Sequence, residues 1–193
     1  DYGGGVGNTI LEIYLKSLFK DNLRASLYDQ NTNLVELSEK FLKAKIEKKI
    51  YKKISFIKST KNLKKKFDAI HFGSMFEHIN KENLFFKDLF HKIGSKPKFL
   101  FFSDLFITNS NVNDFYCVGR YYNQSYIVKF HNLKKITTLL KIFGYELIDQ
   151  KKYLPNIQGQ LRFYDMENLP KKNRIYYTMN LIFKKKNTSL NVQ

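Results

Sequence analysis

A glycine-rich segment at the start of the sequence constrains the fold more than any other feature. Residues 1–7 read DYGGGVG, and apolar residues at helical spacing follow over residues 9–19. Alternate glycines let a tight loop approach a ligand and then enter a helix, and such loops normally follow a buried strand. We therefore expect a ligand site at this loop. We also expect that a first strand has been lost from the chain before Asp1.

Short apolar runs and helical patterns alternate along the rest of the sequence. Strands are predicted near residues 24–28, 54–57, 67–72, 99–102, 145–152 and 175–183, and helices near residues 9–19, 31–49, 81–93 and 133–143. This alternation predicts an α/β fold, a three-layer Rossmann-like sheet that is mostly parallel and carries helices on both faces. No convincing helix joins the last two strands, so we expect the last strand to be antiparallel.

Length and composition indicate how the chain is organised. A chain of 193 residues forms one core, and 43% hydrophobic residues exclude intrinsic disorder. We predict a single domain over residues 1–185 and a disordered tail over residues 186–193. Two irregular insertions are expected, at about residues 104–130 and 154–174. The first is long enough to be a lid or a substrate-facing insertion.

The chain carries 34 lysines and arginines against 17 acidic residues, a formal net charge of +17. Such a charge suggests nucleic acid or another polyanion as partner. Only four of the cations are arginines, however, and lysine lacks the forked guanidinium that binds phosphates and guanines best. We therefore favour a small-molecule partner over nucleic acid. A basic binding module for nucleic acid or an anionic glycan stays open as the alternative function.

The single cysteine, Cys117, limits the disulfides, metal sites and cellular compartments to be expected. It excludes an intramolecular disulfide and a metal site of several thiolates, so we expect no metal cofactor. No apolar run is long enough to span a bilayer. We expect a soluble protein of the cytoplasm, a reducing compartment, in which Cys117 is a small buried or half-buried apolar residue.

Two common nucleotide-binding patterns do not fit the glycine loop. A dinucleotide fingerprint that starts at Gly3 requires glycine or alanine at the position of Asn8, so a nicotinamide dehydrogenase is disfavoured. A phosphate-binding P-loop requires a lysine followed by serine or threonine, and none follows this loop. The pattern that remains is an acid, Asp1, followed by Gly3, Gly5 and Gly7.

This pattern resembles the first motif of the class I S-adenosylmethionine-dependent methyltransferases. Asp29, at the end of the next predicted strand, matches the acid that binds the cofactor ribose in that family. Residues 67–79, FDAIHFGSMFEHI, resemble its fourth strand and the following turn. The resemblance implies an S-adenosylmethionine cofactor bound by Asp1, the three glycines, Asp29 and Ser74. Ordinary alternatives stay open: a tight turn for the glycines, a helix N-cap for Asp29 and a turn for Ser74.

A narrower resemblance covers residues 1–185. The opening DYGGGVG, GSM at residues 73–75 and FGYEL at residues 143–147 are similar to a family of bacterial methyltransferases encoded among surface-polysaccharide genes. It implies methyl transfer to a small-molecule or saccharide acceptor. The Asn/Asp-Pro-Pro-aromatic signature of amine-methylating nucleic-acid enzymes is absent after residue 72, which disfavours a DNA substrate.

His78 and Glu77 are the candidate catalytic residues. A base that takes the proton of the acceptor assists methyl transfer to oxygen, and histidine titrates near neutral pH. A structural role at the start of a helix is the alternative for His78. Asp104 and His131 are weaker candidates. Tyrosines of the first insertion either stack on a sugar or base, or pack the insertion onto the core. They are Tyr116, Tyr121, Tyr122 and Tyr126.

Overall fold

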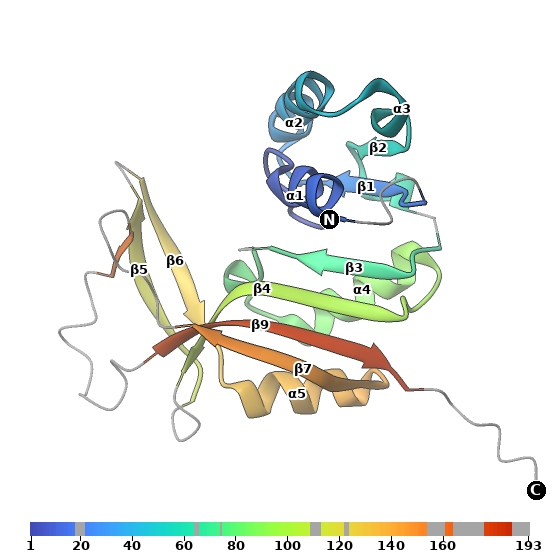
Figure 1. The fold of residues 1–193 in the computed structure, drawn as a ribbon. Coiled ribbons are helices and arrows are strands. Elements are labelled where there is room, and N and C mark those ends of the chain that lie inside the picture. Colours follow the sequence, from blue (N-terminus) through green and yellow to red (C-terminus); the bar gives the residue numbers. More distant parts are fainter. Residues whose placement is uncertain are drawn as a thin grey trace, which may run out of the picture.

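The structure is a computed structural model that describes residues 1–17, 22–63, 66–73, 75–108, 113–121, 124–153, 161–163 and 176–186. These residues form a twisted sheet with helices on both faces and a hairpin at one end (Figure 1). The predicted α/β, Rossmann-like architecture is confirmed. No helix in the described part of the chain is both long and apolar enough to cross a membrane.

Four strands form the parallel part of the sheet: β1 (Ala25–Tyr28), β2 (Ile54–Ile57), β3 (Ala69–Phe72) and β4 (Phe99–Thr108). β1 pairs with β2, and β3 pairs with β4, both in parallel. Tyr2 forms parallel bridges to Tyr28 and to Phe72, so it lies between β1 and β3. The carboxyl ends of β1, β3 and β4 therefore face the same side of the molecule (Figure 1).

Two longer strands complete the sheet: β7 (Tyr145–Tyr153) and β9 (Tyr176–Lys185). β9 lies between β4 and β7 and runs antiparallel to both. The order across the sheet is thus β2-β1-Tyr2-β3-β4-β9-β7. The prediction of an antiparallel last strand is confirmed.

The helices are α1 (Asn8–Lys16), α2 (Thr32–Lys45), α3 (Lys48–Tyr51), α4 (Glu82–Ile93) and α5 (Leu133–Ile142), with short 3-10 helices η1 (Thr60–Leu63) and η2 (Phe76–His78). The helix predicted over residues 31–49 is divided into two, because Ile46 is extended, with φ −111° and ψ 141°. Leu18 and Phe19 of the first predicted helix lie outside the described residues, as do residues 187–193 of the predicted tail.

Alternation along β1 separates two hydrophobic cores. Leu27 packs with α1, α2 and α3, whereas its neighbour Tyr28 belongs to the core under α4 and α5. Successive side chains of a strand point to opposite faces, so each helix group covers its own face of the sheet. Phenylalanines dominate the second core, where the rings of Phe72 and Phe102 stack with centroids 5.0 Å apart.

The predicted irregular insertion at residues 104–130 is regular in its described part. β4 continues to Thr108 through a bulge between Phe102 and Leu105. The bulge shifts the alternation of buried residues by one position, which hides the second half of β4 from a two-residue pattern. β5 (Phe115–Tyr121) and β6 (Gln124–Phe130) then form an antiparallel hairpin.

The second predicted insertion, residues 154–174, is described only at β8 (Leu161–Phe163). β8 pairs antiparallel with β5, so the described parts of both insertions join one small sheet. This sheet stands beside the carboxyl ends of β3 and β4 (Figure 1). Pairing between residues this far apart leaves no local pattern, so the sequence did not reveal it.

Candidate cofactor and acceptor site

The glycine loop, residues 3–7, connects Tyr2 to α1. Gly3, Gly5 and Gly7 have φ of 73°, 51° and 86°, values that glycine adopts more readily than any other residue. A Cβ at Gly3 would lie 2.6 Å from Cγ of Met75, whereas no atom lies within 4 Å of a Cβ at Gly5. The loop is therefore in close contact with the turn after β3 and leaves open space beside Gly5.

Asp29 follows β1 and ties the glycine loop to the start of α2. Its Oδ2 accepts a hydrogen bond from the backbone nitrogen of Gly5 at 3.0 Å, and its Oδ1 accepts one from that of Asn31 at 2.8 Å. Asn31, and not Asp29, is the N-cap of α2, so the capping alternative for Asp29 is wrong. A carboxylate has further lone pairs, so Asp29 can also accept from ligand hydroxyl groups beside the loop.

Asp1 lies beneath the loop, and its side chain is only 3% exposed. Its Oδ1 lies 2.9 Å from Nδ1 of His71. Its Oδ2 is buried and has no hydrogen-bond partner among the described residues. The same oxygen lies 2.9 Å from the position of a Cβ at Gly4. A buried carboxylate oxygen without a donor is costly, so a donor that reached this atom would stabilise the site.

His71 belongs to this site, although the sequence did not single it out. It lies in β3 between Ile70 and Phe72, which both face the core under α4 and α5. Alternation places His71 on the opposite face, where Nε2 lies 2.7 Å from Oγ of Ser103. A histidine between two apolar residues of a buried strand was the signal that could have revealed it.

η2 places the two predicted catalytic residues in different surroundings. Glu77 is 5% exposed, and its Oε2 has no hydrogen-bond partner in the described part of the chain. Burial raises the pKa of Glu77 to about 7, and the charge of Asp104 acts in the same direction. His78 is exposed, and its Nδ1 donates to the carbonyl of Ile127 at 3.1 Å. In the neutral imidazole Nε2 is then the basic nitrogen.

Two other predicted residues have distinct environments. Asp104 is exposed and lies in the bulge of β4 with a φ of 57°, which is strained for a residue other than glycine. Its backbone nitrogen donates to Oδ1 of Asn180 at 3.0 Å. Ser74 lies outside the described residues, so its predicted role stays a prediction.

Buried charges attach the hairpin to the start of α4. Lys129 of β6 is 4% exposed and donates to Glu82, and its Nζ lies 3.4 Å from Oδ2 of Asp114. His131, the other weak candidate, is fully buried against Phe76, with Nδ1 3.3 Å from Oε1 of Glu82. Burial would raise the pKa of Glu82, but the nearby His131 ring and the hydrogen bond from Lys129 outweigh it and lower that pKa to about 2.

The hairpin has one buried and one exposed face. Cys117, Val128 and Phe130 pack together on the first, which confirms that Cys117 is a buried apolar residue. Large apolar side chains are exposed on the second, on the side from which Lys129 reaches α4. They are Tyr116, Val118 and Ile127. We call these three residues the hairpin apolar face. The side chains of Tyr121, Tyr122 and Tyr126 lie outside the described residues.

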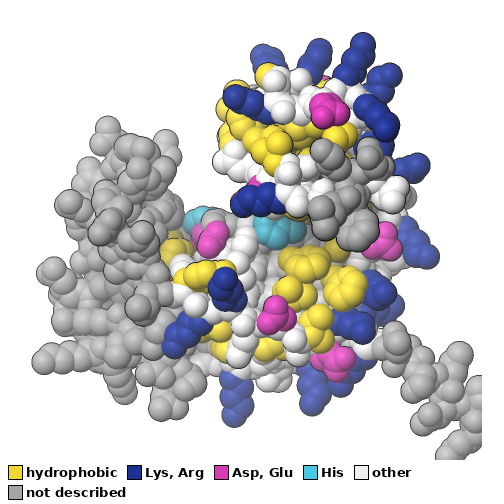
Figure 2. All heavy atoms as spheres, in the orientation of Figure 1, with side chains coloured by type: hydrophobic (Ala, Val, Ile, Leu, Met, Phe, Trp, Pro, Cys, Tyr) yellow, Lys and Arg dark blue, Asp and Glu magenta, His cyan; other side chains and the backbone are white. Residues whose placement is uncertain are grey.

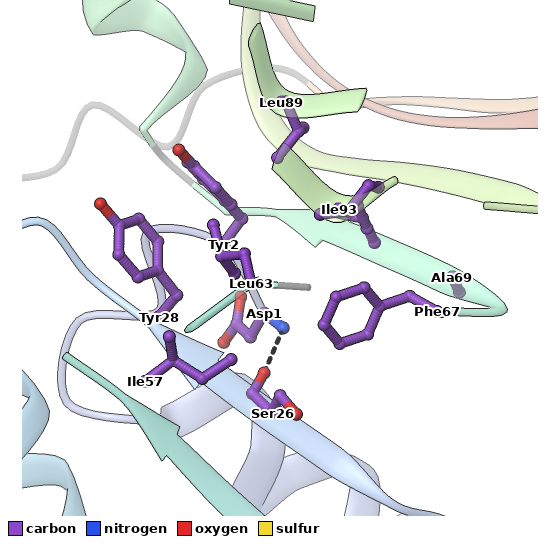
Figure 3. Close-up of a pocket in the computed structure, with 11 residues that line it drawn as sticks. Asp1, Tyr2, Ser26, Tyr28, Ile57, Leu63, Phe67, Ala69, Leu89 and Ile93 are labelled. Atoms are coloured by element: carbon purple, nitrogen blue, oxygen red, sulfur yellow. Dashed lines mark hydrogen bonds between the residues drawn. The ribbon is translucent and has the colours of Figure 1, made fainter. Parts of the chain in front are cut away.

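A cavity of about 30 Å³ lies at the other end of Tyr2. Figure 3 shows that its lining is mostly apolar and that the backbone nitrogen of Asp1 donates to the carbonyl of Ser26, at 2.8 Å. Ser26 and Ala69, in its wall, lie in the first halves of β1 and β3. The cavity is thus on the side of Tyr2 away from the glycine loop, and Asp1 lines it as well.

No family model matches the sequence, and no curated protein matches it. Among solved structures, the glycopeptide N-methyltransferase MtfA complexed with S-adenosyl-L-methionine is similar to this chain. The two are 9% identical with a TM-score of 0.61, over 96% of this chain and 85% of that one.

Two further solved structures are similar. Magnesium protoporphyrin IX methyltransferase from Synechocystis PCC 6803, with bound S-adenosylmethionine, is 12% identical, with a TM-score of 0.59 over 96% of this chain and 68% of that one. An S-adenosylmethionine-dependent methyltransferase from Methanosarcina mazei is 14% identical, with a TM-score of 0.60 over 96% of this chain and 90% of that one. The fold is therefore that of the class I S-adenosylmethionine-dependent methyltransferases.

Proposed function

We propose that this chain is a methyltransferase that binds S-adenosylmethionine and transfers its methyl group to a small-molecule or saccharide acceptor. The observation that carries the proposal is the pairing of the glycine loop with Asp29. The backbone of the loop has positive φ at three glycines, and there is open space beside Gly5. The Asp29 carboxylate accepts a hydrogen bond from the backbone nitrogen of Gly5. This arrangement lies at the carboxyl ends of parallel strands, where such folds bind nucleotides.

The residues of the loop fit the chemistry of this cofactor. Asp29 would accept from the ribose hydroxyl groups, and the glycine backbone would approach the amino-acid portion closely. The unpartnered Oδ2 of Asp1 is an acceptor of the kind that an ammonium group requires. Ser74 stays a proposed wall of the same pocket.

The bound cofactor would supply an electrophilic methyl group on its sulfonium. The chain then has to align the acceptor, exclude water and accept one proton. Nε2 of His78 is the proposed base, because the bond from Nδ1 to Ile127 orients the ring. Glu77, with a pKa raised to about 7 by burial, is the second proposed acid–base group.

The hairpin apolar face is the proposed acceptor surface. Tyr116 is 48% exposed and Ile127 is 63% exposed, on a sheet that stands beside the carboxyl ends of β3 and β4 (Figure 1). An aromatic ring offers a flat apolar surface to the C–H face of a sugar. The resemblance to methyltransferases of surface-polysaccharide genes supports a saccharide in particular.

The net charge gives less support to a polyanion-binding module. On the described part of the face shown in Figure 2, lysine and arginine side chains lie around the helical end and along the right and lower edges, with acidic and apolar side chains between them. Several lysines are engaged with acids, for example Lys58 with Glu36 and Lys92 with Asp88. A protein that tracks a phosphate backbone presents its cations along one groove or stripe.

Thermal-shift titrations with S-adenosylmethionine, S-adenosylhomocysteine, NAD and a heparin fragment would test the function. We expect stabilisation by the first two alone, which at about 100 times the dissociation constant adds about 2.7 kcal/mol. Stabilisation by heparin alone, weakening steeply with salt, would replace the methyltransferase by the binding module. Release of S-adenosylhomocysteine in a screen of hydroxylated and amino sugars would then identify the acceptor.

A further inference from the structure

We propose that His71 is a positioning residue of the cofactor site, which holds the Asp1 carboxylate and is itself held by Ser103. The inference rests on the proposed function, since the quantity that His71 controls is the affinity for S-adenosylmethionine. Three neighbouring segments supply the three side chains: the residues just before the glycine loop, β3 and β4. The distances are 2.9 Å from Asp1 Oδ1 to His71 Nδ1 and 2.7 Å from His71 Nε2 to Ser103 Oγ.

The bond from His71 determines which oxygen of Asp1 lies beneath the glycine loop without a hydrogen-bond partner. A carboxylate accepts only, so Nδ1 of His71 donates to Oδ1. That contact prevents rotation of the carboxylate and keeps Oδ2, which has no partner among the described residues, beneath Gly4. The side chain of Asp1 is 3% exposed, so water cannot readily replace the lost donor if His71 is removed.

Ser103 fixes the orientation and the tautomer of the ring. With the proton of the neutral imidazole on Nδ1, Nε2 accepts from the hydroxyl of Ser103. Ser103 directly precedes Asp104, whose backbone nitrogen is bonded to Asn180 of β9. The chain of hydrogen bonds anchors Asp1 to β4, and the Asp104–Asn180 bond holds β4 to β9.

The two nitrogens of His71 can be removed one at a time. In His71→Asn the amide nitrogen replaces Nδ1 and can still donate to Asp1, whereas in His71→Gln it replaces Nε2 and reaches only Ser103. His71→Phe removes both contacts and keeps the ring. A role in packing alone predicts that the phenylalanine variant binds best. A positioning role predicts that the asparagine variant does.

The experiment is calorimetric titration of S-adenosylhomocysteine into the purified wild-type protein and these variants, with a thermal unfolding curve for each. We expect His71→Asn within about threefold of wild type, His71→Gln and His71→Phe weaker by about tenfold or more, and Ser103→Ala weaker by about threefold. Asp1→Asn is expected to lose about as much affinity as His71→Gln, and combining the two should add little.

Each other outcome counts against the proposal. Wild-type affinity for S-adenosylhomocysteine in His71→Gln and His71→Phe overturns it. A loss of affinity that is proportional to the drop in unfolding temperature across all variants overturns it as well. A wild-type protein that binds no S-adenosylhomocysteine removes the proposed function and this inference together. NMR gives a readout free of the cofactor: a solvent-protected imidazole N–H signal is expected in wild type and absent in His71→Gln, and its absence from wild type overturns the hydrogen-bonded chain.

Discussion

The glycine loop and the β5–β6 hairpin lie at the same end of the sheet, and different forces hold them. The loop is held mostly by its backbone, through bonds such as those from Gly3 and Gly4 to the carbonyl of Tyr28. The hairpin joins β4 through backbone bonds at His131 but is attached to α4 by side-chain charges, above all the bond of Lys129 to Glu82, which joins residues 47 positions apart. The comparison teaches that the proposed cofactor half rests largely on backbone hydrogen bonds, which a side-chain substitution leaves in place, whereas the acceptor half rests on ion pairs that a single substitution removes.

Lys129→Met should give the largest effect on stability. It also tests whether the cofactor half and the acceptor half are stabilised independently. It leaves Glu82 and Asp114 beside each other without their buried cation, which is expected to cost about 3–5 kcal/mol of unfolding free energy. Urea unfolding measures the loss. Lys141→Met, at an exposed position of α5, should stay within about 0.5 kcal/mol of wild type.

Lys129→Met also tests whether the hairpin and the glycine loop are held independently of each other. If the hairpin is anchored separately from the loop, Lys129→Met retains its affinity for S-adenosylhomocysteine below its unfolding temperature. A parallel loss of cofactor affinity would mean that the two halves fold as one unit. The double variant Lys129→Met/Glu82→Gln should be less destabilised than Lys129→Met alone, because no unpaired Glu82 charge remains.

Glu77→Gln should change stability in a pH-dependent way. The pKa of Glu77 is about 7 in the folded protein, against 4.5 as its ordinary value, so the folded state prefers the protonated acid. The native side chain therefore carries no penalty below pH 4.5 and a growing one between pH 4.5 and 7. We expect the glutamine variant to gain about 3 kcal/mol over wild type at pH 8 and almost nothing at pH 4.

Urea unfolding of both proteins at pH 4, 6 and 8 checks this expectation. A difference that does not vary with pH would show that Glu77 is already paired in solution. If Glu77 also serves the chemistry, methyl transfer should fall in the more stable variant. That result would assign the buried carboxyl group to the acceptor half of the site.

Asp29→Asn tests whether the charge of Asp29 contributes to cofactor binding separately from its hydrogen bonds to the loop. The variant keeps one oxygen to accept a backbone N–H but loses the charge, so the loop should fold while S-adenosylhomocysteine binds about tenfold more weakly. Calorimetry gives the affinity, with Asp149→Asn on exposed β7 as the matched control. Unchanged affinity in Asp29→Asn would remove this acid from the proposed cofactor site.

Ile127→Ser should have the smallest effect on stability and act only on the acceptor. The side chain is 63% exposed, so we expect a change of no more than about 0.5 kcal/mol. KM for the acceptor should rise severalfold with cofactor affinity unchanged. Ile142→Ser, at an exposed position of α5, controls for loss of surface apolar area. Equal kinetics in the two variants would exclude the hairpin apolar face from acceptor binding.

Much of the fold could be predicted because its signals are local. The helical spacing, the buried strands and the lack of a helix before β9 each lie within a short window of sequence. The second half of β4 was missed because a bulge at Asp104 breaks the alternation. The hairpin was missed because its two short strands, FYCVGRY and QSYIVKF, bury only one face, at Cys117 and Val128, and carry a weak pattern.

The sequence by itself determined the glycine loop, the acid after β1 and the α/β order, because backbone conformation and strand periodicity are properties of neighbouring residues. Only the tertiary structure decided that His71 meets Asp1 and Ser103, and that Lys129 meets Glu82. Those contacts join side chains that are solvent-exposed in the unfolded chain, and their partners come together only when the sheet and its hairpin have formed. A polar residue within an apolar strand indicates that its side chain needs a hydrogen-bond partner. Which residue becomes that partner depends on the tertiary fold.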